Sequence, residues 1–186
     1  MTRRGYVAVA VIGAAVIGIT AVIAPAPGLM WNATASVPTG LYMVHRQDRY
    51  QLGELVAVEP PKPLAIWLAR RGYLPIGVPL MKHVAGIPGQ MLCRRGVTIS
   101  VDERTLGDAR LRDSRGRPLP RWSGCRRIPV GSLFLMNAGV PDSLDGRYFG
   151  PLPATTIVGL ATPILTRATP DTPLEWRLGS GGSDRP

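Results

Sequence analysis

Glycine and proline interrupt this chain at close intervals. The sequence holds 22 glycines and 19 prolines among 186 residues, which is roughly double ordinary usage. Because both residue types favour turns and interrupt helices, long helices cannot make up most of the fold. We therefore expect a mainly β fold with one short amphipathic helix over residues 64–71. The patterns predict strands over residues 52–58, 80–85, 97–101, 131–136 and 156–165.

The N-terminal segment contains an uncharged, largely apolar run, Tyr6–Ala24, which follows two arginines. A helix of this length crosses the hydrocarbon core, whereas the apolar part of a signal peptide needs only about 7–15 residues. Because the arginines lie before the run, that end is expected in the cytoplasm. The alternative is a signal peptide cleaved after Ala26, but Pro27 beyond that bond disfavours cleavage. Residues 1–28 are therefore predicted to be a cytoplasmic N-terminus and a transmembrane anchor.

The composition excludes several classes of site. Two cysteines and two histidines cannot form a zinc centre of four cysteines or of three histidines. The glycine-rich motifs that bind dinucleotides or nucleoside triphosphates are absent from the sequence. We therefore expect neither a metal nor a cofactor.

The first of three chemically suggestive motifs surrounds Ser36, about a dozen residues beyond the apolar run. Small residues precede this serine, and Val37-Pro38-Thr39-Gly40 follows it. This pattern predicts a tight turn that exposes the hydroxyl. Taken alone, a serine before such a proline is usually a structural turn residue.

The second motif contains Lys82, one of only two lysines in the chain. In a regular strand Lys82 shares a face with Leu80 and Val84. Burial on that face would lower the pKa of the ammonium group, because the charged form loses its hydration. A neutral amine is what a general base for a serine hydroxyl must be. The alternative is a lysine at the sheet edge that extends its amine into water.

The third motif, Ser143–Pro151, places a carboxylate two residues before an arginine, amid glycines and aromatic residues. Asp145 and Arg147 are candidates for an ordered, buried ion pair. An ordinary polar turn is the alternative.

Together, and in this order, the three motifs resemble the type I signal peptidase family. They are more closely similar to its conjugative-transfer branch, the TraF-type pilin-processing peptidases. That family has a membrane anchor followed by a serine box, a lysine box and a box with an aspartate and an arginine. The resemblance covers about residues 3–165. Two positions depart from the family pattern, namely Gln90, where aspartate is common, and Gly146, where serine is common.

The resemblance implies a catalytic dyad with Ser36 as nucleophile and Lys82 as general base. An acyl-enzyme on the serine would then be resolved by water or by an amine, and the sequence does not distinguish hydrolysis from cyclisation of the product. Neither His45 nor His83 has a role in such a dyad. The supporting residues that the resemblance implies are Thr34, with the backbone N–H of Ser36, in the oxyanion hole, Ser143 beside Lys82, and the pair Asp145 and Arg147.

The resemblance further implies a single-pass protein of the bacterial inner membrane with a signal-peptidase-like β domain in the periplasm. That domain would cover residues 29–168, with an insert at about 93–130, and a disordered polar tail would follow over 169–186. The implied substrate is an exported or membrane-bound precursor, such as a conjugative pilin subunit, cut after small residues. The alternative is a non-catalytic, membrane-anchored assembly component that binds through its insert. A dyad of Ser36 and Lys82 argues against this alternative, because a scaffold needs neither residue.

The predicted insert is rich in arginine and is bounded by the two cysteines. An oxidising compartment favours a disulfide between Cys93 and Cys125. Residues 94–127 contain ten arginines against four acidic residues. They could face anionic lipid, an acidic partner or nucleic acid in transit, or form an ordinary solvated surface. Trp122 is the only aromatic residue there, so a platform for stacking nucleic-acid bases is not expected.

Overall fold

The structure, a computed structural model, describes Ile12 and residues 28–177. The predicted transmembrane anchor over residues 6–24 therefore lies outside the described residues, apart from Ile12. Within the described part of the chain, none of the helices is both long enough and apolar enough to cross a membrane.

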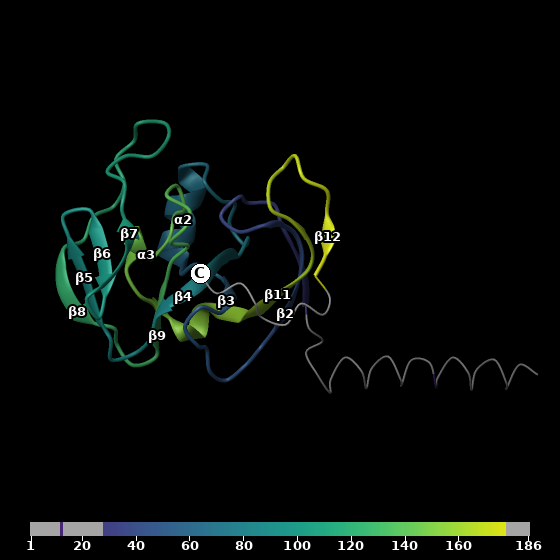
Figure 1. Cartoon of the computed structure of the whole chain (residues 1–186), viewed down its shortest axis with the longest axis horizontal. Helices are drawn as coiled ribbons and strands as arrows, with labels where there is room; N and C mark the ends of the chain where they lie inside the picture. Colours follow the sequence, from purple (N-terminus) through teal and green to yellow (C-terminus); the bar gives the residue numbers. More distant parts are fainter. Residues whose placement is uncertain (1–11, 13–27, 178–186) are drawn as a thin grey trace, which may run out of the picture.

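The larger of two sheets has eight strands and runs through the middle of the molecule (Figure 1). Its order is β1-β2-β11-β3-β4-β9-β10, and β12 also pairs with β11. All of these pairs are antiparallel. The strands are β1 (Gly28–Asn32), β2 (Thr39–His45), β3 (Leu55–Val58), β4 (Leu80–Gly86), β9 (Ser132–Leu135), β10 (Leu152–Pro153), β11 (Ile157–Arg167) and β12 (Glu175–Trp176). The prediction of a mainly β fold is thereby confirmed.

The smaller sheet forms a lobe at one end of the molecule, in the order β7-β6-β5-β8 (Figure 1). Cys93 and Cys125 lie opposite each other on its strands β5 and β8 and form a disulfide, as the sequence predicts. The strands are β5 (Met91–Arg95), β6 (Thr98–Val101), β7 (Arg104–Asp108) and β8 (Gly124–Arg127). The helical elements within residues 28–177 are α2 (Lys62–Arg70), α3 (Gly146–Phe149) and the 3-10 turn η1 (Ala154–Thr156).

The two sheets share a hydrophobic core. Phe134, on β9 of the larger sheet, is completely buried. It belongs to one cluster with Leu92, Ile99 and Ile128, which come from the smaller sheet and the segment after it. Burial of apolar side chains between sheets is the main source of stability in such a fold. The smaller sheet is therefore packed on the larger one and does not form a core of its own.

Two segments differ from their predictions. The strand expected over 52–58 begins only at Leu55, because Gln51 and Glu54 close a turn. In that turn the Gln51 backbone N–H donates to the Glu54 carboxylate at 2.8 Å. Part of the tail expected to be disordered is ordered, since Trp176 of β12 pairs with Leu165 of β11. Backbone hydrogen bonds supply that order, and a polar composition gives no sign of them; residues 178–186 lie outside the described part.

Candidate active site

The turn that carries Ser36 joins β1 to β2 and is organised by the side chain of Asn32. The Asn32 amide nitrogen donates to the carbonyl oxygens of Thr34, Val37 and Pro38 at 2.9, 3.2 and 3.1 Å. Its Oδ1 accepts from the Thr34 backbone N–H at 3.0 Å. An asparagine that bonds nearby backbone groups in this way fixes a turn locally. Asn32 is not among the residues predicted from the sequence, although asparagine is a common turn residue.

Two further contacts fix the same turn at its far end. The hydroxyl of Tyr42 donates to the carbonyl of Pro38 at 2.7 Å. Gly40 has φ +144°, and a Cβ there would lie 2.1 Å from the carbonyl oxygen of Leu165. Only glycine permits this close approach of β2 to β11.

Lys82 lies on β4, in the middle of the larger sheet. Its side chain is only 3% exposed, and its Nζ donates to the Ser36 Oγ at 3.0 Å. Burial lowers the pKa of this lysine to about 8. The nearby negative charge of Asp145 opposes this shift, and the positive charge of Arg147 reinforces it. A substantial fraction of the amine is therefore neutral in mildly alkaline solution.

The Ser36 and Lys82 side chains face a cavity of about 360 Å³. Its walls are mostly apolar and come from α2, the segment after α2, and the loop before α3. An apolar cavity that contains a nucleophile and a base suits an extended peptide with small or apolar side chains. The lining residues are Thr34, Ala35, Ser36, Leu68, Tyr73, Leu74, Leu80, Lys82, Val140, Asp142, Ser143 and Leu144.

Thr34 and Ser143 lie in this cavity, as their implied roles require, but neither is fully engaged. The Thr34 hydroxyl is 3.4 Å from the Ser36 Oγ and donates its proton to Asn32 Oδ1 at 2.7 Å. It must rotate before it can donate to an oxyanion. The buried Ser143 hydroxyl has no hydrogen-bond partner among the described residues, so the contact with Lys82 that the resemblance implies is not formed here.

Asp145 and Arg147 form the buried ion pair that the third motif predicts. Arg147 Nε and Nη2 donate to the two carboxylate oxygens, each at 2.9 Å, and both side chains are excluded from solvent. Such two-point pairs are strong and geometrically specific. The same Nη2 donates to the carbonyls of Val140 and Ser143 at 2.7 and 3.2 Å. The pair therefore holds the loop that forms one wall of the cavity.

The side chain of Asn137, just after β9, connects the three motifs, and the sequence analysis missed it. Its Nδ2 donates to the Ser36 carbonyl at 2.8 Å and to the Met81 carbonyl at 3.1 Å. Its backbone N–H donates to the Asp145 carboxylate at 3.1 Å. No local signal marks this residue, because Asn137 lies 101 positions from Ser36 in the sequence.

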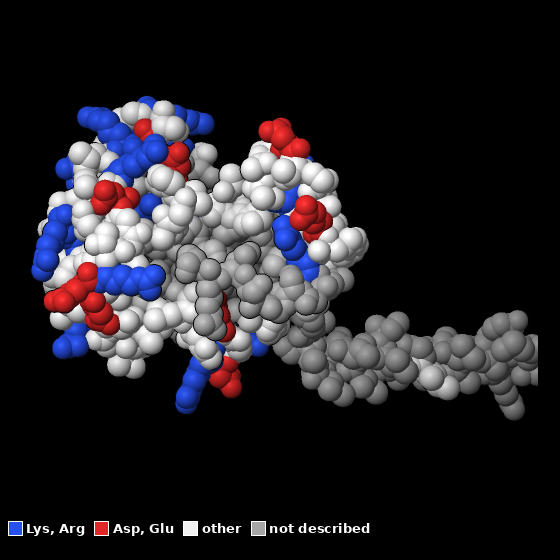
Figure 2. Space-filling model, viewed as in Figure 1, with Lys and Arg blue, Asp and Glu red and all other residues white. Residues whose placement is uncertain are grey.

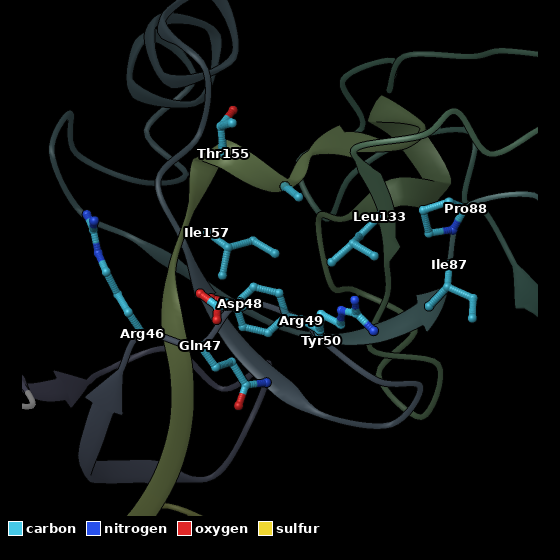
Figure 3. A pocket seen from close by; sticks show the side chains of 11 residues that line it. Arg46, Gln47, Asp48, Arg49, Tyr50, Ile87, Pro88, Leu133, Thr155 and Ile157 are labelled. Atoms are coloured by element: carbon cyan, nitrogen blue, oxygen red, sulfur yellow. The ribbon is translucent and has the colours of Figure 1, made fainter.

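A larger hollow of about 790 Å³ lies elsewhere and shares no lining residue with the cavity of Ser36 and Lys82. Figure 3 shows the Tyr50 ring between Ile157 and Leu133 within it. Its polar lining comes mainly from Arg46 to Arg49, in the loop after β2, and from Thr155 of η1. These side chains do not form a pair of nucleophile and base. We therefore place the candidate active site in the smaller cavity.

A profile of the family described as signal peptidase, peptidase S26, matches residues 1–166. The chain belongs to this family. It is 39% identical over 151 residues to a probable conjugal transfer protein TraF of Sinorhizobium fredii, covering 76% of this chain and 79% of the relative. It is 36% identical over 150 residues to the conjugal transfer protein TraF of Agrobacterium fabrum, covering 75% and 83%.

A solved signal peptidase I from Enterococcus faecalis is also similar to this peptidase-family chain. Sequence identity is 19%, the match covers 63% of this chain and all of the other, and the TM-score is 0.39. This likeness is too distant to carry an argument about the site. The family membership that the three motifs indicate rests on the profile and on the relatives.

The structure shows what surrounds the two residues that depart from the expected motif pattern. The Gln90 side-chain carbonyl accepts from the Ile87 N–H at 2.9 Å, and its amide donates to Asp102 at 2.8 Å. At Gly146, a Cβ would lie 2.5 Å from the ring of Phe134. Phe134 therefore occupies the space that a serine side chain would need.

Proposed function

We propose that this member of the signal peptidase family is a membrane-anchored serine endopeptidase with Ser36 as nucleophile and Lys82 as general base. The observation that carries the proposal is the 3.0 Å hydrogen bond between a buried amine and a hydroxyl in an apolar cavity. A structural lysine has no need of burial against a turn serine, since removing an ammonium group from water is costly. A general base does need it, because burial favours the neutral form.

The geometry supports a two-step acyl transfer. Neutral Lys82 takes the proton from the Ser36 hydroxyl while the Ser36 oxygen bonds to the substrate carbonyl carbon. The resulting oxyanion accepts hydrogen bonds from the Ser36 backbone N–H and from the rotated Thr34 hydroxyl. The peptide C–N bond then breaks, and the Lys82 ammonium gives its proton to the leaving amine. Water or an amine then attacks the ester carbonyl and gives a proton to Lys82, which passes it to the Ser36 oxygen as the ester C–O bond breaks.

The proposed substrate is an exported or membrane-bound precursor, such as a pilin subunit of a conjugative system. The mostly apolar lining of the cavity suits small residues such as alanine beside the cut. The relatives in Sinorhizobium and Agrobacterium are named for conjugal transfer, which supports a precursor of a transfer apparatus.

An exposed apolar row beside the serine turn supports action at the bilayer surface. Trp31, Leu41, Leu165 and Trp176 are cross-strand partners on neighbouring strands, so their side chains share one face. Trp31 and Trp176 are 56% and 68% exposed. Exposed tryptophans are typical of the membrane–water interface. With residues 1–28 as the proposed anchor, this face would lie against the outer leaflet of the inner membrane.

The test uses the full-length chain reconstituted in vesicles with the membrane-bound pilin precursor of the same transfer system. Ser36→Ala, which removes the nucleophile, and Lys82→Ala, which removes the base, should each abolish processing. Lys82→Arg should abolish it as well, because a guanidinium cannot become neutral. Lys62→Ala removes the other lysine, which is exposed, and should leave processing unchanged. Full processing by a Ser36 or Lys82 variant would overturn the dyad. Failure of the unmodified chain to process any candidate precursor would favour the non-catalytic assembly component instead.

A further inference from the structure

The side-chain amide of Asn137 makes four hydrogen bonds around the dyad. Two are the donations from Nδ2 to the Ser36 and Met81 carbonyls described above. On its other side, Oδ1 lies 3.1 Å from the backbone nitrogen of His83 and 3.0 Å from the His83 ring Nδ1. Asn137 is only 3% exposed, so these protein groups take the place of water.

The surroundings fix which way the amide points. A backbone N–H can only donate, so the amide oxygen must face His83. Backbone carbonyls can only accept, so the amide nitrogen must face Ser36 and Met81. Only a primary amide offers two donors and two acceptors in one planar group. Because Oδ1 can only accept, the neutral ring of His83 must carry its proton on Nδ1.

The bonded groups lie on both sides of Lys82 in the chain. The Met81 carbonyl belongs to the peptide group before Lys82, and the His83 N–H belongs to the peptide group after it. A single amide therefore holds both peptide groups that flank the base and also the carbonyl of the nucleophile.

The backbone of Asn137 is itself fixed by the buried ion pair of the third motif. The Asn137 N–H donates to the Asp145 carboxylate at 3.1 Å, and Arg147 donates to the Asn137 carbonyl at 3.3 Å. The ion pair thus reaches the nucleophile and the base through this residue.

We infer that Asn137 is a positioning residue, which sets the separation and orientation of the Ser36 hydroxyl and the Lys82 amine. This inference rests on the proposed function. Asn137 does not line the substrate cavity, so it acts on the chemical step and not on substrate binding. A displacement of about 1 Å in a reacting group can lower a rate about 10²-fold.

The kinetic test compares two substitutions of nearly equal shape. Asn137→Asp keeps the acceptor and loses both donations, and Asn137→Leu loses all four bonds. With a quenched peptide spanning the precursor cleavage site, each should lower kcat about 10²-fold. KM should stay within about threefold, because the cavity lining is unchanged.

The matched control is Ile99→Ala, which opens a cavity in the shared core away from the dyad. It should lower Tm at least as much as the Asn137 variants do and leave kcat unchanged at temperatures where all the proteins are folded. A kcat within threefold of the unmodified chain for both Asn137 variants would overturn the inference. If Ile99→Ala lowers kcat as much as the Asn137 variants do, the loss follows from lower stability, and the inference is overturned as well.

A second measurement needs no variant and no activity. Nitrogen-15 NMR of the full chain in micelles at pH 8.5 should show the His83 ring protonated on Nδ1. A ring protonated on Nε2 would contradict the amide orientation and thus the inference. If the unmodified chain lacks activity but His83 carries the Nδ1 proton, the proposed function fails and the amide arrangement stands. If the chain is active and the Asn137 variants match it, the inference alone fails.

Discussion

The surroundings of the dyad and the arginine-rich lobe use charge in opposite ways. Around the dyad, the charged groups Lys82, Asp145 and Arg147 are few and almost completely buried. On the lobe of β5–β8 and the loops beside it, basic side chains are numerous and most of them are exposed (Figure 2). Buried charges depend on fixed partners, whereas exposed pairs contribute little. Substitutions around the dyad should therefore change the rate of the chemical step. Substitutions on the lobe should mainly change stability or the shape of the cavity.

One set of contacts on the arginine-rich lobe does reach the cavity. Arg117 forms an ion pair with Asp113 at 2.7 Å, and its guanidinium lies 4.7 Å from the ring centroid of Tyr73, a cavity wall residue. It also donates to the Arg71 carbonyl at 2.9 Å. The Tyr73 hydroxyl donates to Asp113. The lobe therefore braces the cavity wall through this loop, and its Arg110 also forms an ion pair with Asp142, another residue of the cavity wall.

The largest effect is expected from replacing the base with an apolar residue of similar length. Lys82→Met should lower processing at least 10³-fold. The same change should stabilise the fold at pH 7 by roughly 3 kcal/mol, because the folded pKa of Lys82 is lowered from 10.5 to about 8. Denaturant unfolding of both proteins across pH measures this gain.

Because the pKa of Lys82 is lowered in the folded chain, the stability of the fold depends on pH in a defined direction. Between pH 8 and 10.5 the unfolded chain binds the Lys82 proton more tightly than the folded chain does, so wild-type stability rises with pH through this window. The gain in the free energy of unfolding from Lys82→Met should be largest below pH 8 and should vanish above about pH 10.5. A variant less stable than the wild type at pH 7 would contradict the burial of an unfavourable charge.

The disulfide should give the next largest effect, on stability alone. Cys125→Ser opens the Cys93–Cys125 link, which spans 32 positions, and should cost about 3–4 kcal/mol in the chain-entropy account. The kcat of the folded protein should be largely retained, since the dyad lies outside the closed loop. Thiol alkylation of the protein isolated from its native membrane checks the premise, and two free thiols would refute it.

A smaller effect is expected where the chain departs from its family. Gly146→Ser brings a Cβ within 2.5 Å of the Phe134 ring and should destabilise the fold by about 1–3 kcal/mol through overpacking. Phe134→Leu alone creates a cavity, but together with Gly146→Ser it should recover part of the loss. A double-mutant cycle measures this coupling, and purely additive losses would show that the two positions do not compete for space.

The smallest effect is expected from the brace on the lobe. Arg117→Gln removes the ion pair and the ring contact and should raise KM several-fold with kcat unchanged, because Tyr73 forms part of the cavity wall. Arg104→Gln, an exposed arginine of the same lobe, is the matched control and should change neither constant. Equal effects of the two substitutions would mean that charge on the lobe matters in general and the brace does not.

The sequence predicts the features that depend on short motifs. Ser36 before its proline, the alternation around Lys82 and the spacing of Asp145 and Arg147 are all local patterns, and the structure brings these residues together. Asn137 escaped prediction because its partners come from distant strands, and a single asparagine after a strand has no distinctive local pattern. Strand β12 escaped because its order depends on β11 and not on its own composition.

The central claim is that a neutral Lys82 activates Ser36, and the pH dependence of single-turnover cleavage tests it most directly. The cleavage rate of the membrane-bound precursor by the wild-type chain should rise about tenfold per pH unit below pH 8 and level off above it, because the pKa of Lys82 is about 8. A rate that stays flat between pH 6 and pH 9 would contradict the account.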